Sequence, residues 1–396
     1  MEMGSRPFVA GVGMIPFAKP GQSESWDVMG AQAAKLALED AGLSYADVQQ
    51  AYVGYVYGDS TSGQSALYEV GITGIPIVNV NNNCSTGSTA LFLARQAVEA
   101  GVVDVALALG FEQMTPGALQ AVFTDRKTAM FKFLEPMARC QEPDPNAPGA
   151  AQFFGGAGRE YQEKYGASNE TFAKISVKAR KHAARNPYAI FRSELTLDEV
   201  LASPHIYGPL TRFQCCPPTC GAAAAVIVSP AYARKKGLTG LVEVVGQALT
   251  TDTGSTFDPP SMMNVAGYDM ARNAARLVYE QAGVGGEDVQ VVELHDCFTA
   301  NELITYEALG LCGEGHAEQF ISDGENSYGG RVVTNPSGGL LSKGHPLGAT
   351  GLAQCFELVN QLRGTSGDRQ VENVAHALQH NVGLGGACVV TMYRRA

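Results

Sequence analysis

Long apolar runs and a surplus of positive charge are both missing from this sequence. No stretch approaches 18 uninterrupted apolar residues, the length that a helix needs to cross a bilayer, so we expect no membrane span. Lysine and arginine number 28 against 39 aspartates and glutamates, and the net charge of −11 argues against a nucleic acid partner. With 45% hydrophobic and 17% charged residues, the composition is typical of a globular protein.

The termini lack two common address signals. The first residues, MEMGSRPFVAGVGM, contain no basic start followed by an apolar run, and the last residues, MYRRA, do not match an SKL-type peroxisomal signal. The nine cysteines are odd in number and irregularly spaced, which indicates free thiols rather than a disulfide framework. Together these features predict a cytoplasmic protein.

The sequence does contain an internal repeat. Four pairs of segments match in the same order: 38–54 with 279–295, 87–91 with 348–352, 105–109 with 374–378, and 221–228 with 386–393. The offset falls from 269 to 165 at the last pair, so the first half holds about a hundred extra residues. We therefore expect an N-terminal half (1–120 plus 211–240), an inserted loop domain (121–210) and a C-terminal half (241–396).

Helical and strand-like patterns alternate within each half. Residues 27–41 and 86–100 have helical patterns, and 50–57, 75–80 and 103–110 are short apolar runs typical of strands. This alternation predicts a layered α/β fold. The helix at 86–100 is apolar nearly all round, so we expect it to be buried between sheets.

The predicted insert is slightly basic, unlike the acidic remainder of the chain. It contains a helical, basic segment, FAKISVKARKHAARN (172–186), with five lysines and arginines. Two interpretations are open: a solvated helix face, or a patch that meets a phosphorylated ligand.

The repeat aligns two chemically active residues. Extending the match at 87–91 places Cys84, in NVNNNCSTGSTALF, opposite His345, in SKGHPLGATG. Each comes just before a predicted helix, where unpaired N–H groups and the helix dipole favour a thiolate. Cys84 alone could be a small buried hydrophobic residue. Its correspondence with His345 indicates instead a nucleophile, and if the two halves pack about a pseudo-twofold axis the thiol and the imidazole meet in one cleft.

In two further segments, an apolar strand is followed directly by titratable residues or by glycines. VVELHDCFTANE places His295, Asp296 and Cys297 at such an end, where titratable side chains typically face a site. Asp296 either orients a neighbour or is solvated or salt-bridged. QHNVGLGGA places His380 before a glycine-rich run. The backbone around Gly383 could offer N–H donors to a ligand or simply form a bulge, and His380 could line the site or support that turn.

Cys84, HDCF (295–298), GHP (344–346) and HNVGLGG (380–386), in this order, resemble the thiolase family, and specifically its sterol carrier protein 2 type. The similarity runs over essentially the whole chain. It implies the α/β thiolase fold: two homologous βαβαβαββ halves in a layered αβαβα arrangement, with an inserted loop domain. That expectation agrees with the duplication and insertion found in the sequence.

Two departures from most thiolases are visible. Most have NEAF where this chain has HDCF, and a cysteine in a C-x-G motif where it has His380. The sterol carrier protein 2 type implies that Cys297 supplies the second thiol. The CCPPTCG cluster (215–221) superficially resembles a metal motif, but without a second cysteine pair we expect buried thiols and no metal site.

The resemblance implies thiolysis of 3-oxoacyl-CoA, with coenzyme A as co-substrate and no permanently bound cofactor. Cys84 would attack the 3-oxo carbon, and the N–H groups of Cys84 and around Gly383 would hold the oxyanion. His345 and His295 would stabilise the enolate, and Cys297 would move protons. The alternatives are a thiolase-fold aldolase, or a non-catalytic homologue that binds acyl-CoA or lipid.

The resemblance also implies acyl-CoA substrates and a homodimer or tetramer. The acyl chain could be medium-length, long, branched or a sterol side chain. The apolar strand at 103–110 is compatible with pairing across an interface between subunits.

Overall fold

The computed structural model describes residues 6–117, 119 and 123–396 of the chain. The predicted domain boundary at 120–121 and the first five residues lie outside this part. The helices and strands of the first half are β1 (Phe8–Met14), α1 (Trp26–Ala41), β2 (Gln50–Gly54), α2 (Ser62–Tyr68), β3 (Ile77–Val80), α3 (Thr86–Glu99), β4 (Val105–Glu112), β7 (Gly221–Val228) and α8 (Pro230–Lys236).

The second half repeats this order of elements. It comprises β8 (Val242–Thr250), α9 (Met262–Val265), α10 (Tyr268–Ala282), β9 (Val291–Glu293), α11 (Thr299–Ala308), α12 (Ala317–Ser322), β10 (Val333–Thr334), α13 (Gly339–Ser342), α14 (Thr350–Arg363), β11 (His376–Gly383) and β12 (Ala387–Arg395). Between β4 and β7 lie α4 (Phe131–Cys140), α5 (Gly149–Tyr165), α6 (Asn169–Ala183), α7 (Leu197–Leu201), β5 (His205–Tyr207) and β6 (Leu210–Thr211).

The strand order confirms the duplication. The strands of the first half lie in the order β3-β2-β4-β7-β1, and those of the second in the matching order β10-β9-β11-β12-β8. A short antiparallel contact between β1 and β8, through Phe8 and Val9, joins them into one continuous sheet. In each half the three strands farthest from this junction are parallel, and the two nearest to it are antiparallel to their neighbours.

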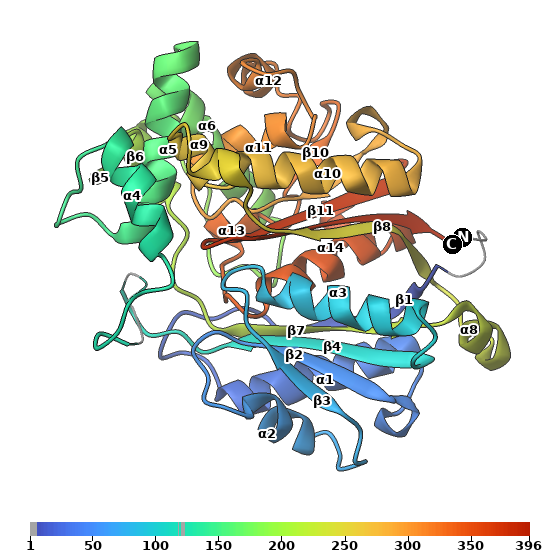
Figure 1. Cartoon of the computed structure of the whole chain (residues 1–396). Helices are drawn as coiled ribbons and strands as arrows, with labels where there is room; N and C mark the ends of the chain where they lie inside the picture. Colours follow the sequence, from blue (N-terminus) through green and yellow to red (C-terminus); the bar gives the residue numbers. More distant parts are fainter. Residues whose placement is uncertain (1–5, 118, 120–122) are drawn as a thin grey trace.

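Five layers follow from the packing, as the thiolase fold implies. Helices α3 and α14 lie between the two sets of strands, α1 covers the outer face of the first set, and α10 and α11 cover that of the second (Figure 1). The small residues at the start of α3 allow this approach, because a Cβ on Gly87 would lie 2.6 Å from the carbonyl oxygen of Gly348. The predicted burial of the 86–100 helix is confirmed.

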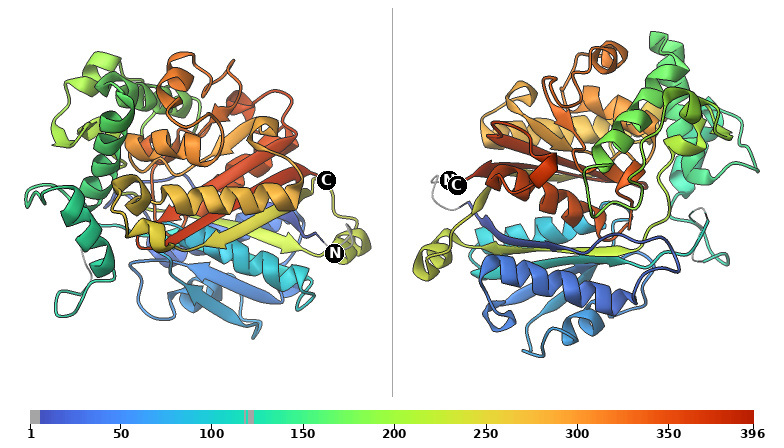
Figure 2. Two further views of the ribbon diagram at one scale, coloured as in Figure 1. Left: turned by 45° about the horizontal axis from the view of Figure 1, so that its top comes forward. Right: turned by 180° about the vertical axis from the view of Figure 1, so that it is seen from behind.

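The inserted segment packs on the opposite half from the one that contains it. Helices α5 and α6 contact α9, α11, α12 and α13, and their buried aromatic residues belong to the core of the second half. Figure 2 shows α4–α6 standing at one end of the molecule, beside the second set of strands. We propose the division 1–120 plus 211–240, 121–210 and 241–396. In it, the insert closes one end of the cleft between the halves.

The expectation that strand 103–110 could pair across a subunit interface is wrong. This strand is β4, which pairs with β2 on one side and with β7 on the other, so it offers no free edge. The outer edge of the first set of strands is β3. No helix in the described part of the chain is long and apolar enough to cross a membrane.

Candidate active site

Cys84 lies in a tight turn between β3 and α3. Asn83 has a positive φ of 51°, which asparagine tolerates better than most residues. Its side-chain amide donates to the carbonyl of Leu384 at 2.9 Å, and the N–H of Asn82 donates to the hydroxyl of Thr86 at 2.8 Å. The turn is therefore tied both to its own helix and to the end of β11.

Gly383 is the point at which β11 reaches this turn. A Cβ at Gly383 would lie 2.0 Å from the carbonyl oxygen of Asn82, so only glycine allows the approach. The backbone N–H groups of Cys84 and of Leu384, the next residue, each act to lower the pKa of the Cys84 thiol, and Sγ itself donates to Oδ1 of Asn83 at 3.5 Å. That the backbone around Gly383 supplies donors for the reaction stays a prediction.

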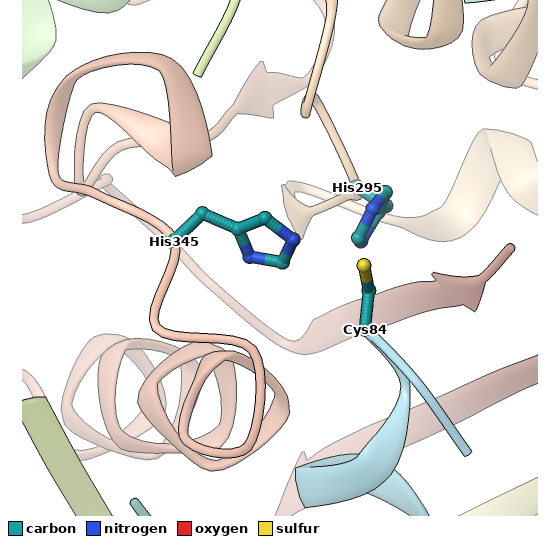
Figure 3. A group of neighbouring side chains, drawn as sticks. All are labelled: Cys84, His295 and His345. Carbon is teal, nitrogen blue, oxygen red and sulfur yellow. The ribbon is translucent and has the colours of Figure 1, made fainter. Parts of the chain in front are cut away.

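His345 precedes α14 and points back toward Cys84 from the second half (Figure 3). Its backbone N–H donates to the hydroxyl of Thr219 at 3.1 Å, and its ring Nδ1 lies 2.7 Å from the hydroxyl of Thr350. The hydroxyl of Thr350 donates its own proton to the carbonyl of Pro346 at 2.9 Å. Nδ1 of His345 must therefore carry the proton in this contact, which leaves Nε2 with a free lone pair.

His295 completes a group of three reactive side chains. A sulfur or ring nitrogen atom from each of Cys84, His295 and His345 lies within 4.8 Å of the corresponding atoms of the other two. The two imidazole rings are nearly perpendicular, with centroids 5.1 Å apart. Figure 3 shows both rings directed at the sulfur. Three such atoms are a possible set of metal ligands. They also form a possible catalytic group, in which two imidazoles lie beside one nucleophilic thiol.

Burial sets the charge states in this group. It raises the pKa of the Cys84 thiol to about 12, and the nearby Glu112 carboxylate adds a smaller upward effect. Burial lowers the pKa of His345 to about 3 and that of His295 well below its ordinary value. The expectation of a thiolate stabilised by the helix terminus is wrong for the resting site, because desolvation outweighs the backbone donors. The structure instead presents a neutral thiol beside a neutral imidazole.

Cys297 lies between β9 and α11, and its side chain is buried. Its carbonyl accepts from the N–H of Cys216 at 2.8 Å, and its thiol has a pKa raised well above the ordinary value by burial. Asp296 is neither solvated nor salt-bridged. It is fully buried, and its carboxylate accepts the backbone N–H groups of Leu340 (2.7 Å) and Leu341 (3.4 Å) at α13. Of the two roles that the sequence left open, Asp296 thus orients a neighbouring turn.

His380 does not line the cavity in the described structure. It is fully buried on β11, and its ring Nδ1 accepts the backbone N–H of His295 at 3.4 Å. Gln354 of α14 holds the carbonyl of His380 at 3.1 Å. Of the two roles left open by the sequence, this geometry favours support, with the HDCF segment as the group supported.

A cavity of about 570 Å³ ends at Cys84, Cys297 and His345. Its walls are mostly apolar and come from both halves and from the insert. The apolar lining side chains include Met114, Leu119, Phe154, Phe191, Ile206, Phe213, Phe298, Leu341, Leu347 and Leu384. Two thiols of the CCPPTCG cluster, Cys215 and Cys216, also line it, whereas Cys220 is buried just before β7. The sequence therefore missed the proximity of Cys216 to the site.

Sequence reasoning also missed the polar residues behind the reactive group. Thr350 and Thr219 hold His345, and Glu112 accepts backbone N–H groups of Val56, Tyr57 and Gly348 at 3.0 Å each. Thr350 was detectable through the repeat, because Thr89 occupies the equivalent place in the first turn of the first-half helix. Nothing in the sequence around Glu112 marks it.

Comparison with known proteins identifies the family. The N-terminal domain model of thiolases matches residues 8–202, and the C-terminal domain-like model matches residues 254–393. Sterol carrier protein 2 of Bos taurus is 52% identical over 393 residues, covering 98% of this chain and 72% of that protein. The benzoylsuccinyl-CoA thiolase subunit BbsB of Thauera aromatica is 37% identical, covering 100% and 99% of the two chains.

Among solved structures, the Ltp2-ChsH2(DUF35) aldolase is similar, with a TM-score of 0.83 and 26% identity over 99% of this chain and 98% of that one. The fold, the duplicated strand order and these matches lead to one conclusion. The chain belongs to the thiolase family of acyltransferases, and within it to the sterol carrier protein 2 type.

Proposed function

We propose that this protein cleaves 3-oxoacyl-CoA by thiolysis, giving acetyl-CoA or propionyl-CoA and a shortened acyl-CoA. The observation that carries the proposal is the meeting of the Cys84 thiol with the free Nε2 of His345 at the closed end of an apolar cavity. A thiol with a raised pKa needs a base at the moment of attack, and a neutral imidazole is such a base.

In the first step, His345 takes the proton of Cys84 while Sγ attacks the 3-oxo carbon. The N–H groups of Cys84 and Leu384 receive the oxyanion, since both already act to lower the pKa of the Cys84 thiol. Preorganised donors of this kind each contribute about 2.7–4 kcal/mol when they are removed singly. The bond between C2 and C3 then breaks, which leaves an acyl group on Cys84 and the enolate of acetyl-CoA or propionyl-CoA.

The enolate oxygen then lies between His345, now protonated at Nε2, and His295. Cys297 protonates the C2 carbon and becomes a thiolate. It next removes the proton of incoming coenzyme A, whose sulfur attacks the acyl group. Cys84 leaves and recovers its proton from His345, so every group returns to its starting state. Coenzyme A is the co-substrate, and no resident cofactor takes part.

Two arginines of the cavity are candidates for binding the phosphate groups of acyl-CoA. Arg180 of α6 and Arg212 line it, and neither takes part in any of the ion pairs formed among the described residues. The guanidinium of Arg180 lies 4.3 Å from the ring centroid of Phe191. A cation without a carboxylate partner suits a phosphate group. We therefore favour the phosphorylated-ligand interpretation of the basic segment at 172–186.

The cavity supports an apolar acyl group, and its size suits a long, branched or sterol side chain. For assembly we propose a homodimer or tetramer that uses β3, an edge strand with exposed Val78. Val78→Lys should then shift the mass measured by light scattering toward the monomer. All nine cysteines are free, which supports a reducing compartment such as the cytoplasm.

The test is the coenzyme A-dependent loss of a 3-oxoacyl-CoA, with products identified by mass spectrometry. Wild-type protein should release acetyl-CoA or propionyl-CoA plus the shortened acyl-CoA, and Cys297→Ala should lose most of this rate. If Cys297→Ala keeps nearly full rate, the proton shuttle is elsewhere and this part of the proposal fails.

The similarity to an aldolase gives the second candidate function. A retro-aldol cleavage would need neither coenzyme A nor an acyl-enzyme, so turnover of a 3-hydroxyacyl-CoA without added coenzyme A would favour it. Binding of acyl-CoA with no turnover at all would favour the non-catalytic homologue.

A further inference from the structure

A chain of buried hydrogen bonds leads from β12 toward the active site. The hydroxyl of Tyr393 donates to Oε1 of Gln379 at 2.5 Å. Nε2 of Gln379 donates to the carbonyl of Gly351 at 2.6 Å and to the hydroxyl of Ser88 at 2.9 Å. All of these side chains are fully buried. The chain crosses between the halves, because Ser88 lies on α3 and Gln379 on β11.

The chain continues to the ring of His295. The hydroxyl of Ser88 lies 2.9 Å from Oδ1 of Asn381, and Nδ2 of Asn381 lies 2.9 Å from Nδ1 of His295. Asn381 and His295 are buried as completely as the other side chains in this series of hydrogen bonds. The ring therefore has one nitrogen held from behind, and the other faces Cys84.

The direction of donation is set at the carbonyl of Gly351. A carbonyl can only accept, so the amide nitrogen of Gln379 must face it, and the same nitrogen then donates to Ser88. The proton of Ser88 is directed to Asn381, its acceptor within the described structure. Asn381 must present its oxygen to Ser88 and its NH₂ group to His295.

Nδ1 of His295 is consequently an acceptor, and the proton of the neutral ring lies on Nε2. His345 is held in the opposite way, since its Nδ1 donates to Thr350 and its Nε2 is bare. The two imidazoles that face Cys84 thus differ in tautomer. One offers a lone pair, and the other offers an N–H.

We infer that Asn381, held by Ser88, is a positioning residue that keeps His295 in the Nε2–H tautomer. In this tautomer His295 donates to the enolate oxygen, while His345 receives the thiol proton. The inference deepens the proposed function and rests on it for the identity of the reaction. The tautomer itself can be measured without turnover.

The other tautomer would leave the site with two lone pairs and no imidazole donor. The unprotonated Nε2 atoms of both His295 and His345 would then face the resting thiol. The enolate oxygen would meet a lone pair of His295 instead of an N–H group. Losing one such donor slows catalysis by about 10²- to 10³-fold. Holding the tautomer of His295 therefore gives this buried chain of hydrogen bonds a role in catalysis.

The experiment uses protein labelled with ¹⁵N at its seven histidines. Nitrogen chemical shifts distinguish protonated from bare ring nitrogens, and the His295 signals are assigned by their absence in His295→Gln. In wild-type protein we expect a bare Nδ1 and a protonated Nε2. In Asn381→Asp, the carboxylate should draw the proton to Nδ1, and kcat should fall about 100-fold while KM changes little.

Asn335→Asp is the matched control. Asn335 is also a fully buried asparagine, its Oδ1 accepts the N–H of Leu294, and its side chain forms no hydrogen bond to the His295 ring in the described structure. It should lose stability without changing the His295 tautomer. If Asn381→Asp does not fold, Ser88→Ala serves instead, because it frees the amide of Asn381 and should produce a mixture of both tautomers.

A wild-type spectrum with the proton on Nδ1 of His295 would overturn the inference. So would an altered tautomer in Asn381→Asp with an unchanged kcat, or an unaltered His295 signal in Ser88→Ala. Absence of thiolysis in wild-type protein with the expected tautomer present would instead count against the proposed function alone.

Discussion

The turns before α3 and α14 are built in the same way and perform different chemistry. Thr89 donates its hydroxyl to the carbonyl of Ser85 at 3.0 Å, and Thr350, 261 positions later, donates to Pro346 at 2.9 Å. In the first half this threonine accepts from the amide of Asn82. In the second it accepts from the ring of His345. The duplicated turn supplies a position beside the cleft, and the residue placed there decides the role.

The same type of turn therefore has two different chemical roles in the two halves. Cys84 uses its position to expose a sulfur to two backbone N–H groups, whereas His345 uses its position to expose a bare nitrogen to that sulfur. Neither residue would be reactive alone, because burial holds the thiol protonated and the imidazole neutral. Three predictions test how far the two turns differ, and a fourth concerns His380 on the neighbouring strand β11.

Removing the first-half nucleophile should have the largest effect. Cys84→Ala should lower kcat for thiolysis by at least about 10⁴-fold, since no acyl-enzyme can form. Cys355→Ala is the control, because Cys355 is an equally buried thiol on α14 that does not line the cavity. Equal losses in the two variants, measured by coenzyme A-dependent turnover, would contradict a special role for the first turn.

Removing the second-half base should come next. His345→Ala should reduce the rate of Cys84 acylation by about 10²- to 10⁴-fold, the usual contribution of a positioned base. His295→Ala should cost about 10²- to 10³-fold as a lost donor. Stopped-flow acylation separates the two, with partly buried His376→Ala as control. A normal acylation rate in His345→Ala would show that another group takes the thiol proton.

The two threonines sharpen the comparison further. Thr350→Val removes the acceptor that holds Nδ1 of His345 and should reduce kcat by about 10- to 100-fold, the cost seen when the partner that orients a metal-ligating imidazole is removed. Thr89→Val has no imidazole to release, so it should mainly lower the free energy of unfolding by about 1 kcal/mol. Steady-state kinetics and urea unfolding of both variants check this. Similar kinetic losses would mean that the two turns do not differ as described.

The smallest effect on activity should come from His380. Burial lowers its pKa to about 3, so between that value and the ordinary 6.5 the unfolded chain binds a proton that the folded chain does not. Its contribution therefore destabilises the protein as pH falls through this window, by about 1.4 kcal/mol per pH unit. His380→Gln should unfold with a shallower pH dependence and keep most of its kcat. Identical slopes between pH 5 and 6.5 would contradict this assignment.

Much of the fold was predictable because the repeat is written in the sequence. Four matched segments were enough to predict the two halves and the insertion, and the pairing of Cys84 with His345 followed from one alignment. The strand at 103–110 shows where this reasoning ends. Its apolar run looked available for pairing, but strand β7, more than a hundred residues later, occupies that edge. Long-range pairing of this kind leaves no local signal.

The site was less predictable than the fold, for two physical reasons. Desolvation depends on what covers a group, so the pKa direction of Cys84 could not be obtained from its place before a helix. The role of Asp296 stayed open for the same reason, since its partners are backbone groups of α13 rather than cations. The chain from Tyr393 to His295 joins residues of both halves, and only the folded structure brings them together.

The central claim is that the two turns jointly acylate Cys84, and intact-protein mass spectrometry tests it most directly. Wild-type protein mixed with a 3-oxoacyl-CoA in the absence of free coenzyme A should gain the mass of the shortened acyl group on Cys84. The adduct should form far more slowly in His345→Ala and should disappear when coenzyme A is added. An acyl group on another residue, or cleavage of the substrate with no adduct on Cys84, would contradict the account.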